Sequence, residues 1–443
     1  MIRHADVSLQ NHDERVESLV QQVREHAVAG VHDLRPLAGH ACGRGRVLDT
    51  SALAHVLEID PERRRCLAEP GVRFRDLVRA TLPLGLIPTV VPELECLTLG
   101  DAIADCTVAS SSFRHGSFFD SVDELELITG TGELLTLTPA SDPLTFPMVH
   151  GSHDTLGAIT RIGLRLVPSL PFVRLRYQRH RSLTTFHAAL RARVEAGDVD
   201  FIDGIIHAPD HLTLCLGEYV ARAPYVSDYR HDDIFYKSTR HRALDYLGIE
   251  DYLFRYDTEC HWLTRTIPGL EHPLLRRLLG DRLLGSINLQ RWSRRLAPLI
   301  RQLQRRPDVN LDLLIPDHRF ADFHRWYARE PRFYPLWILP MCLPRAGYPW
   351  IADEHARRID DDLLIDCAIR GMPNDEVDRD WSERFEAQTF ACDGLKTRCA
   401  RNHDIRQRFF QIYHQPNYTT AKQRLDPHGL FHRDLFERLH DPD

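Results

Sequence analysis

The chain has 443 residues, of which 43% are hydrophobic and 27% are charged, as is ordinary for a soluble globular protein. This is long for a single domain, so we expect two closely joined domains. A formal net charge of -7 argues against a general nucleic-acid-binding protein. The ten cysteines form no CxxC pair, which is typical of a reducing compartment and gives no metal signal.

The sequence also gives an expectation about membranes. The charged first twenty residues lack the apolar core of a signal peptide, and no apolar run approaches the ~20 residues of a membrane span. We therefore expect a cytoplasmic protein without a signal peptide or transmembrane segment, and peripheral membrane contact stays open.

The first 170 residues mix helical and strand patterns. Apolar residues at helical spacing predict a helix over 12–26, and a second helix is expected over 75–82. Strands are expected at 48–49, 56–60, 66–72, 122–128, 133–138 and 158–167, with a hairpin turn over Thr129–Gly132. The fold class predicted from this mixture is α+β.

The stretch Leu97–Phe118 organises this half of the chain. It is rich in small residues and then presents three consecutive hydroxyls followed by Arg114. Small residues let backbone approach a ligand closely, and main-chain N–H groups, hydroxyls and a guanidinium suit a diphosphate. Gly151–Gly157 is a second tight loop of the same kind. A bound dinucleotide and a buried turn followed by a polar loop remain equal alternatives, while no GxGxxG or GxxxxGK[ST] motif supports a Rossmann or P-loop site.

At these residues the chain resembles a known superfamily. Motifs similar to the FAD-binding domain of the vanillyl-alcohol oxidase / p-cresol methylhydroxylase (PCMH) superfamily are Leu48–Leu53, Glu69–Val72, the stretch Leu97–Phe118, Thr155–Thr160 and the turn Leu425–Phe431. The resemblance narrows to the delta-24 sterol reductase branch at Gln22–Glu25, Val91–Leu94, Leu97–Gly100, Ser110–Ser112, Asp312–Pro316 and Tyr334–Trp337.

The resemblance implies an architecture and an activity. Residues 1–170 would form a two-subdomain PCMH-type FAD-binding domain, and residues 171–443 an α+β substrate (cap) domain whose C-terminal segment returns to the flavin domain. The protein would reduce a C=C bond in a sterol or isoprenoid-like side chain by hydride transfer from reduced flavin, with non-covalent FAD and NADPH as reductant. An alcohol oxidase or dehydrogenase of the wider superfamily and a non-catalytic scaffold with a degraded flavin site remain alternatives.

The resemblance also implies which residues meet the cofactor. From the first loop and the central stretch these are Arg35, Pro36, Gly39, His40, Gly100, Cys106, Thr107, Val108, Ala109, Ser110, Ser111, Ser112, Phe113, Arg114, His115, Gly116, Ser117 and Phe118. From the second loop they are Thr155, Leu156, Gly157 and Ile159. His40 stands where many superfamily members link the flavin covalently, and the alternative is a loop histidine that touches only cofactor or solvent.

Three residues depart from the family pattern. Asp101, Thr107 and Asp154 stand where the family favours glycine, which removes permissive backbone positions. The two carboxylates would also repel an anionic diphosphate unless they point away from it. These departures put FAD binding in question.

The remaining chain is expected to carry the substrate. Strands are predicted at 172–177, 201–206, 211–216, 310–315 and 335–339, with a helix at 183–196 and a lid at 232–267. Reduction of a C=C bond needs a positioned proton donor, and Tyr256, His261 and Tyr334 are chemically able. Ordinary structural roles fit these three residues equally well, so the catalytic residue stays unknown.

Overall fold

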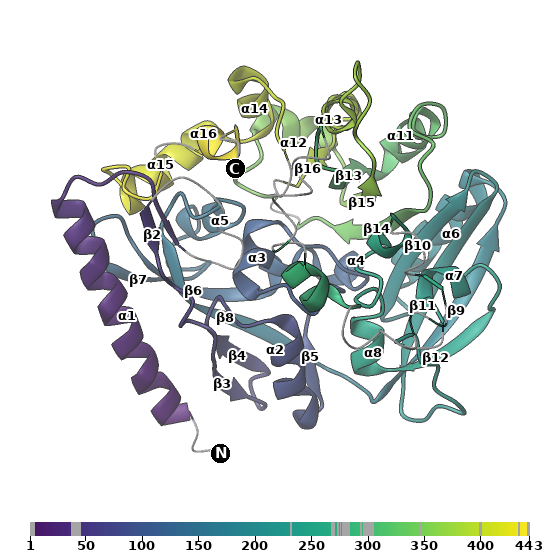
Figure 1. The fold of residues 1–443 in the computed structure, drawn as a ribbon, viewed down its shortest axis with the longest axis horizontal. Helices are drawn as coiled ribbons and strands as arrows, with labels where there is room; N and C mark the ends of the chain where they lie inside the picture. Colours follow the sequence, from purple (N-terminus) through teal and green to yellow (C-terminus); the bar gives the residue numbers. More distant parts are fainter. Residues whose placement is uncertain are drawn as a thin grey trace.

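The computed structural model describes residues 5–36, 46–230, 233–266, 305–344, 347–397, 401–432 and 435–440. Between 267 and 304 it describes residues 271–272, 274, 276, 284–292 and 295. Two antiparallel sheets organise these residues, one in each half of the chain (Figure 1). We call residues 5–168 the first module and residues 172–397 the second module.

The first module is built on a six-stranded sheet. Five strands follow the order β3-β4-β8-β6-β7, and β5 pairs with β8. The strands are β3 (Val56–Asp60), β4 (Arg65–Ala68), β5 (Leu86–Pro88), β6 (Val122–Ile128), β7 (Leu134–Leu137) and β8 (Ala158–Pro168). A separate parallel pair is formed by β1 (Leu34–Pro36) and β2 (Arg46–Leu48). The helices of the first module are α1 (Ala5–Val28), α2 (Phe74–Thr81), α3 (Leu99–Ala104), α4 (Ser112–His115) and α5 (Thr145–Val149).

The second module is built on an eight-stranded sheet. Its order is β12-β9-β11-β10-β14-β15-β13-β16, and every paired neighbour is antiparallel. The strands are β9 (Phe172–His180), β10 (Phe201–Ala208), β11 (His211–Val220), β12 (Leu244–Gly248), β13 (Val309–Pro316), β14 (Leu336–Cys342), β15 (Leu363–Met372) and β16 (Leu395–Lys396). Its helices are α6 (Leu183–Ala196), α7 (Phe235–Ser238), α8 (Ile249–Leu253), α11 (Phe320–Tyr327), α12 (Asp353–Ile359) and α13 (Trp381–Ala391). The predicted α+β class is confirmed.

The two faces of the second sheet bury different cores. Alternate strand residues such as Ile202 and Leu214 pack with Phe186 of α6, Phe323 of α11 and Phe385 of α13 on the outer face. The intervening residues belong to a core that continues into the first module. Because side chains alternate along a strand, one face of this sheet is free to receive the first module.

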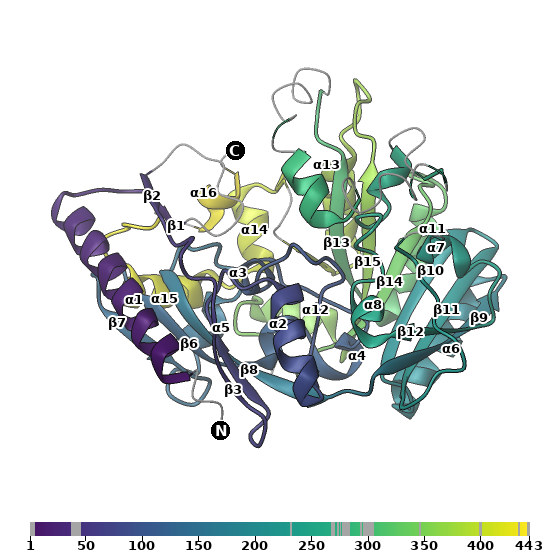
Figure 2. The same ribbon diagram turned by 60° about the horizontal axis from the view of Figure 1, so that its bottom comes forward.

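Helix α4 lies at the junction of the two modules, where its Phe113 packs into the outer core of the second module. In both views α4 lies between the two sheets (Figures 1 and 2). Its neighbouring loop is joined to β10 by a hydrogen bond from the Ile202 amide to the Ser110 carbonyl, at 2.8 Å. The segment 249–262, part of the expected lid, is built into the core that continues into the first module, since Tyr252, Tyr256 and Trp262 are fully buried.

The C-terminal segment returns to the first module. It contains α14 (Arg406–Ile412), α15 (Gln415–Leu425) and α16 (Leu435–His440). The Gly130 amide donates to the Leu425 carbonyl, and the Leu34 amide to the Leu430 carbonyl, both at 2.8 Å. Asp426 accepts hydrogen bonds from the amides of Leu430 and Phe431, so one buried carboxylate shapes the turn that follows α15.

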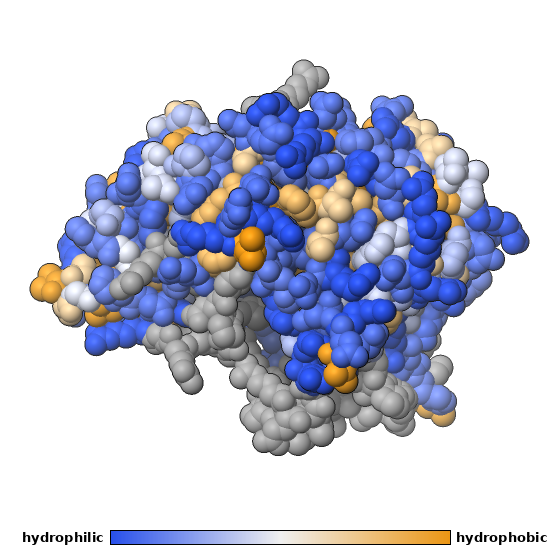
Figure 3. All heavy atoms as spheres, turned by 90° about the horizontal axis from the view of Figure 1, so that it is seen from above, coloured by the Kyte–Doolittle hydropathy of each residue, from blue (hydrophilic) through white to orange (hydrophobic). Residues whose placement is uncertain are grey.

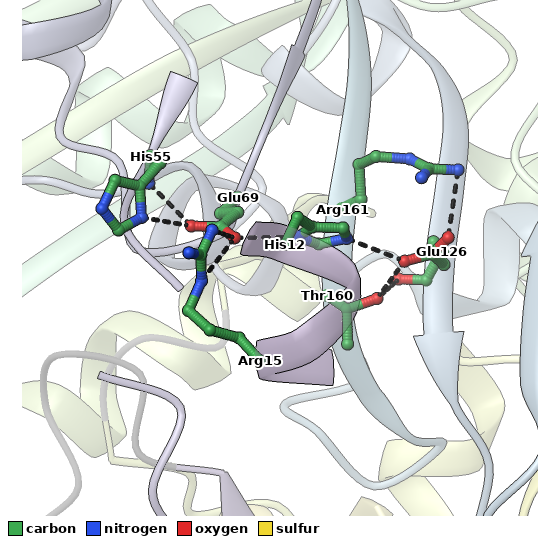
Figure 4. A network of polar contacts seen from close by, with 7 residues as sticks. All are labelled: His12, Arg15, His55, Glu69, Glu126, Thr160 and Arg161. Carbon is green, nitrogen blue, oxygen red and sulfur yellow. Dashed lines mark hydrogen bonds and ion pairs between the residues drawn. The ribbon is translucent and has the colours of Figure 1, made fainter. Parts of the chain in front are cut away.

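A buried polar network fastens α1 to the first sheet (Figure 4). His12 is fully buried, with Nδ1 2.8 Å from a Glu69 oxygen and Nε2 3.1 Å from a Glu126 oxygen. Arg15 and His55 also bond to Glu69. Burial alone raises the pKa of the Glu69 carboxyl, but these hydrogen bonds outweigh it and lower the pKa to about 2. Two ionised carboxylates can only accept, so His12 donates from both nitrogens and is an imidazolium.

No described helix is long and apolar enough to cross a bilayer. The face seen from above in Figure 1 is mostly hydrophilic, with one apolar band across its middle (Figure 3).

Candidate functional site

The turn into α3 depends on a capping box. The Asp101 carboxylate accepts from the Thr98 amide at 3.0 Å and from the Thr98 hydroxyl at 2.8 Å, while the Asp101 amide donates back to that hydroxyl. Gly100 lies against Pro70, where an added Cβ would be 3.3 Å from the proline ring. The turn therefore needs a small residue, and Asp101 has a structural role as a helix cap.

The loop after α3 is held in an uncommon backbone conformation. Cys106 has a φ of +53° and Gly116 a φ of +74°, and a Cβ at Gly116 would come within 2.4 Å of Asp120. The Phe118 amide closes the loop onto the Thr107 carbonyl at 2.9 Å. Only a side chain as small as hydrogen fits at Gly116, which fixes the course of the loop.

The three serine hydroxyls are buried and bonded within the protein. The Ser110 hydroxyl lies 3.2 Å from the Tyr252 hydroxyl, and the Ser111 hydroxyl donates to the Thr89 carbonyl at 2.8 Å. The Ser112 hydroxyl accepts from the Ala109 amide at 3.0 Å. These hydroxyls hold the loop and connect it to the second module.

The rest of the predicted stretch divides between core and surface. Val108, Ala109, Phe113, Ser117 and Phe118 are buried. The Arg114 guanidinium donates to the carbonyls of Gly197 and Val199 at 2.8 and 2.7 Å, so it extends toward the start of β10. Burial, together with the Arg114 charge, lowers the pKa of the His115 imidazole to about 4.

The second predicted loop lies beside the first. The Gly151 amide donates to the Ile103 carbonyl of α3 at 3.0 Å. His153 and Asp154 have φ values of +48° and +61°, so Asp154 adopts the left-handed backbone that glycine adopts most easily. Gly157 is equally constrained, because an added Cβ would lie 2.8 Å from the Ile128 carbonyl.

The C-terminal helix α15 supports this second loop. Lys422 donates to the Thr155 carbonyl at 2.6 Å and to the Asp426 carboxylate at 2.7 Å. The Tyr418 hydroxyl donates to the Thr155 hydroxyl at 2.9 Å. Leu156 is fully buried, and Ile159 lies on β8 opposite Leu127.

The first predicted loop is described only at its start. Arg35 and Pro36 lie on β1, where the Arg35 side chain pairs with Asp33 at 3.1 Å. Gly39 and His40 lie outside the described residues. The structure therefore brings Gly100, the 106–118 loop and the 151–157 loop together, with Arg114 extending away toward residues 197–199.

A second cluster of functional interest lies where the modules meet. From the inner face of β10, Asp203 accepts hydrogen bonds from the Tyr256 hydroxyl at 3.2 Å and the Trp337 indole at 3.0 Å. The Arg255 guanidinium lies 3.4 Å from Asp203 and 3.7 Å from Glu93, which comes from the first module. All five side chains are buried.

Burial decides the protonation of this cluster. It raises the pKa of the Glu93 carboxyl to about 8, even though Arg255 acts in the opposite direction. On β15, burial and the nearby Asp312 raise the pKa of the Asp366 carboxyl well above its usual range. Perturbed carboxyls at a domain interface are typical of functional sites.

The three acids suggested by the sequence occupy different places. Tyr256 belongs to the cluster, and His261 stacks between Tyr256 and Trp337 with ring centroids 5.3 and 5.0 Å away. Burial lowers the pKa of His261 well below its usual range. Tyr334 packs against Tyr327 in the outer core, on the other side of the sheet. Among the described residues, no group of three or more His, Cys, Asp or Glu side chains could hold a metal ion.

Residues 11–138 match a family model described as an FAD binding domain. The chain is 23% identical to the human Delta(24)-sterol reductase over 448 residues, covering 95% of this chain and 85% of that protein. The Delta(24)-sterol reductase of Arabidopsis thaliana is 25% identical over 87% of this chain and 75% of its own length.

This chain is therefore similar to proteins named Delta(24)-sterol reductase along most of its length, and its residues 11–138 match an FAD binding domain. The predicted resemblance is confirmed at this level. The wider superfamily appears as well, because Cytokinin dehydrogenase 10 of Oryza sativa subsp. japonica is 28% identical over 38% of this chain and 33% of its own length.

The residues of the FAD binding domain fit a dinucleotide despite the three departures from glycine. The Asp101 carboxylate is engaged in capping α3, and Asp154 keeps the left-handed backbone of the glycine it replaces. Gly100 and Gly157 hold two backbone segments so close to their neighbours that a side chain would clash or crowd.

Three functional candidates were not singled out from the sequence: Glu93, Asp203 and Lys422. Glu93 lies within the Val91–Leu94 motif that carries the resemblance, so it was present but given no role. Asp203 is the one carboxyl in the apolar run FIDGII, and a charge in a buried strand is a signal in itself. Lys422 has no comparable signal, because only the tertiary fold brings it to Thr155.

Proposed function

We propose that this chain is an FAD-dependent reductase that reduces a C=C bond in the side chain of a sterol or isoprenoid-like molecule, with NADPH as reductant. The observation that carries the proposal is the similarity to proteins named Delta(24)-sterol reductase along 95% of the chain. The buried acid cluster between the modules supports it, since this reaction requires a proton held away from water.

The proposed division of labour follows the two modules. Residues 1–170 bind FAD non-covalently through the residues predicted from the sequence, and residues 171–443 form the cap, with the C-terminal segment returning to the flavin domain. Bound FAD supplies the hydride. Glu93 holds a proton at neutral pH because it is buried, while Asp203 accepts hydrogen bonds from Tyr256 and Trp337 and lies 3.4 Å from the Arg255 guanidinium.

The inner face of the second sheet suits an apolar substrate. Trp337, Leu339, Met341, Leu364 and Ala368 are buried there in one continuous core with the first module. A sterol or isoprenoid chain is bound mainly by burial of such apolar surface. We further propose a cytoplasmic protein that meets membranes at most peripherally.

The visible spectrum of the purified protein, before and after acid precipitation, tests the cofactor. Flavin bands that stay in the supernatant support non-covalent FAD, whereas colour retained in the pellet identifies a covalent anchor at His40. Anaerobic NADPH should bleach the bound flavin, and a sterol with a side-chain double bond should restore its colour and become saturated. A protein that takes up no FAD contradicts the proposal.

An alcohol oxidase or dehydrogenase is the second candidate, favoured by the cytokinin dehydrogenase similarity. It predicts flavin that is reduced by an alcohol and reoxidised by oxygen or another acceptor, without any need for NADPH. The third alternative, a non-catalytic scaffold, rested on the departures from glycine. The Asp101 carboxylate caps the start of helix α3, which gives this departure a structural role and weakens that argument.

A further inference from the structure

A cavity of about 360 Å³ lies between the modules, apart from the cofactor loops. Its wall in the first module comes from Arg73 and Arg75 at the start of α2 and from Glu95. Its wall in the second module includes the buried side chains of Phe254 and Arg255, which follow α8. The volume suits part of a small organic ligand, and domain interfaces are common places for such sites.

The lining of this cavity is unusually charged. Half of its sixteen lining residues carry a charge, and five of these are arginines while three are acids. The arginines are Arg73, Arg75, Arg230, Arg255 and Arg291, and the acids are Glu95, Asp251 and Asp257. An apolar substrate would have to strip water from these groups without replacing their hydrogen bonds, so the sterol-like substrate belongs elsewhere.

The carboxyl groups neutralise only some of the arginines. Glu95 lies between Arg75 and Arg230, at 3.5 and 3.7 Å. Asp257 is occupied by the amide of Glu95, at 2.8 Å, and by Ser286. The cavity therefore keeps guanidinium groups that its own acids do not engage.

Two arginines of the lining are left with unused donors. Within the described residues, the side chains of Arg73 and Arg291 make no hydrogen bond or ion pair. Arg255 also borders the cavity, but its guanidinium is held near Asp203, Glu93 and the Ser110 hydroxyl, which do not line the cavity. Guanidinium groups match phosphate oxygens in geometry and charge.

We propose that this cavity binds a phosphate group, with Arg73 and Arg291 as its principal donors. The group is either part of an organic phosphate monoester or free phosphate. The inference rests on the proposed function in one respect, because the 2′-phosphate of NADPH is such a group. A site here places that end of the reductant between the two modules, on Arg73 of one and Arg291 of the other.

Calorimetric titration of the FAD-loaded protein at low salt tests the site. The probes are adenosine 2′,5′-bisphosphate, adenosine 5′-monophosphate and inorganic phosphate. Tighter binding of the bisphosphate than of both others identifies an organic ligand with a phosphate at the ribose 2′ position. Equal binding of inorganic phosphate identifies free phosphate as the source.

Substitutions locate the binding in this cavity. Arg73→Gln and Arg291→Gln should each weaken bisphosphate binding about tenfold or more, because each removes a charge-assisted hydrogen bond. Glu95→Gln should strengthen binding several-fold, since it frees Arg75 and Arg230. Arg63→Gln removes an arginine that is 84% exposed outside the cavity and serves as the matched control.

The outcomes separate this inference from the proposed function. If no probe binds, or if the Arg73 and Arg291 variants bind as tightly as the parent, the phosphate site is overturned even in a protein that takes up FAD. If the bisphosphate binds to a protein that takes up no FAD, the proposed reductase is overturned while the phosphate site stands. Unchanged binding in the Glu95 variant likewise contradicts this cavity as the location.

Discussion

Replacing His12 with alanine should strongly destabilise the first module. The ring is fully buried and donates to Glu69 and Glu126 at 2.8 and 3.1 Å (Figure 4). Each charge-assisted hydrogen bond contributes about 1.5–3 kcal/mol, and removal of one partner from a buried ionic pair typically costs about 3–5 kcal/mol. Because Arg15 and His55 still bond to Glu69, we expect a loss of about 3–4 kcal/mol rather than more.

The pH dependence of this loss has a definite sign. Burial alone lowers the pKa of His12, but its hydrogen bonds to Glu126 and Glu69 outweigh burial and raise the pKa above 6.5. A raised histidine pKa gives stability that is fully present below pH 6.5 and is lost as the pH rises through the folded-state pKa. The difference between wild type and His12→Ala should therefore be largest near pH 6 and shrink toward pH 9.

Urea unfolding followed by circular dichroism at several pH values measures this difference. His241→Ala, at an exposed histidine in the second module, is the matched control and should cost less than about 0.5 kcal/mol at every pH. A His12 effect that is constant with pH, or that grows as the pH rises, would refute the assignment of His12 as a buried imidazolium.

Three further substitutions test the interface and the cofactor loops. The free energy of unfolding of the wild type should fall by about 1.4 kcal/mol per pH unit between pH 5 and 8, because folded Glu93 holds a proton that the unfolded state releases, and Glu93→Gln should abolish this fall. Denaturation of both proteins at pH 6 and 8 measures it, and the same pH dependence in wild type and variant contradicts it. Lys422→Met should weaken FAD binding at least about tenfold, since the Thr155 carbonyl loses its buried donor; flavin fluorescence titration measures it, and unchanged affinity contradicts it. Gly157→Ala should cost about 2 kcal/mol or more through its clash with the Ile128 carbonyl, whereas Gly248→Ala, whose Cβ would meet only the end of the Asp251 side chain at 3.3 Å, should cost about 1 kcal/mol or less in the same thermal melts.

Local sequence patterns predicted most of the secondary structure. The helix expected over 183–196 is α6, and the strands expected at 122–128 and 158–167 are β6 and β8 almost residue for residue. These elements have clear apolar periodicity and strong breakers at their ends, so local information is sufficient.

The site was harder to predict because its key contacts cross long distances in the chain. The central stretch was recognised by its small residues, but the sequence did not predict that the Arg114 guanidinium bonds to the carbonyls of Gly197 and Val199, so its expected contact with a diphosphate stays a prediction. The segment 232–267 is rich in His, Tyr and Arg, which suggested a lid, yet Tyr252 and Tyr256 within it are fully buried with polar partners. Tertiary pairing of polar groups leaves no local signal in a single sequence.

The support that α15 gives to the second loop affects how the protein acquires its cofactor during synthesis. Thr155 leaves the ribosome about 260 residues before Tyr418 and Lys422, the side chains that fasten it. At ~5–20 residues per second, the FAD binding domain spends on the order of 13–50 s with this loop unsupported. Tight binding of FAD is thus expected only after residues 171–443, which include α15, have been translated.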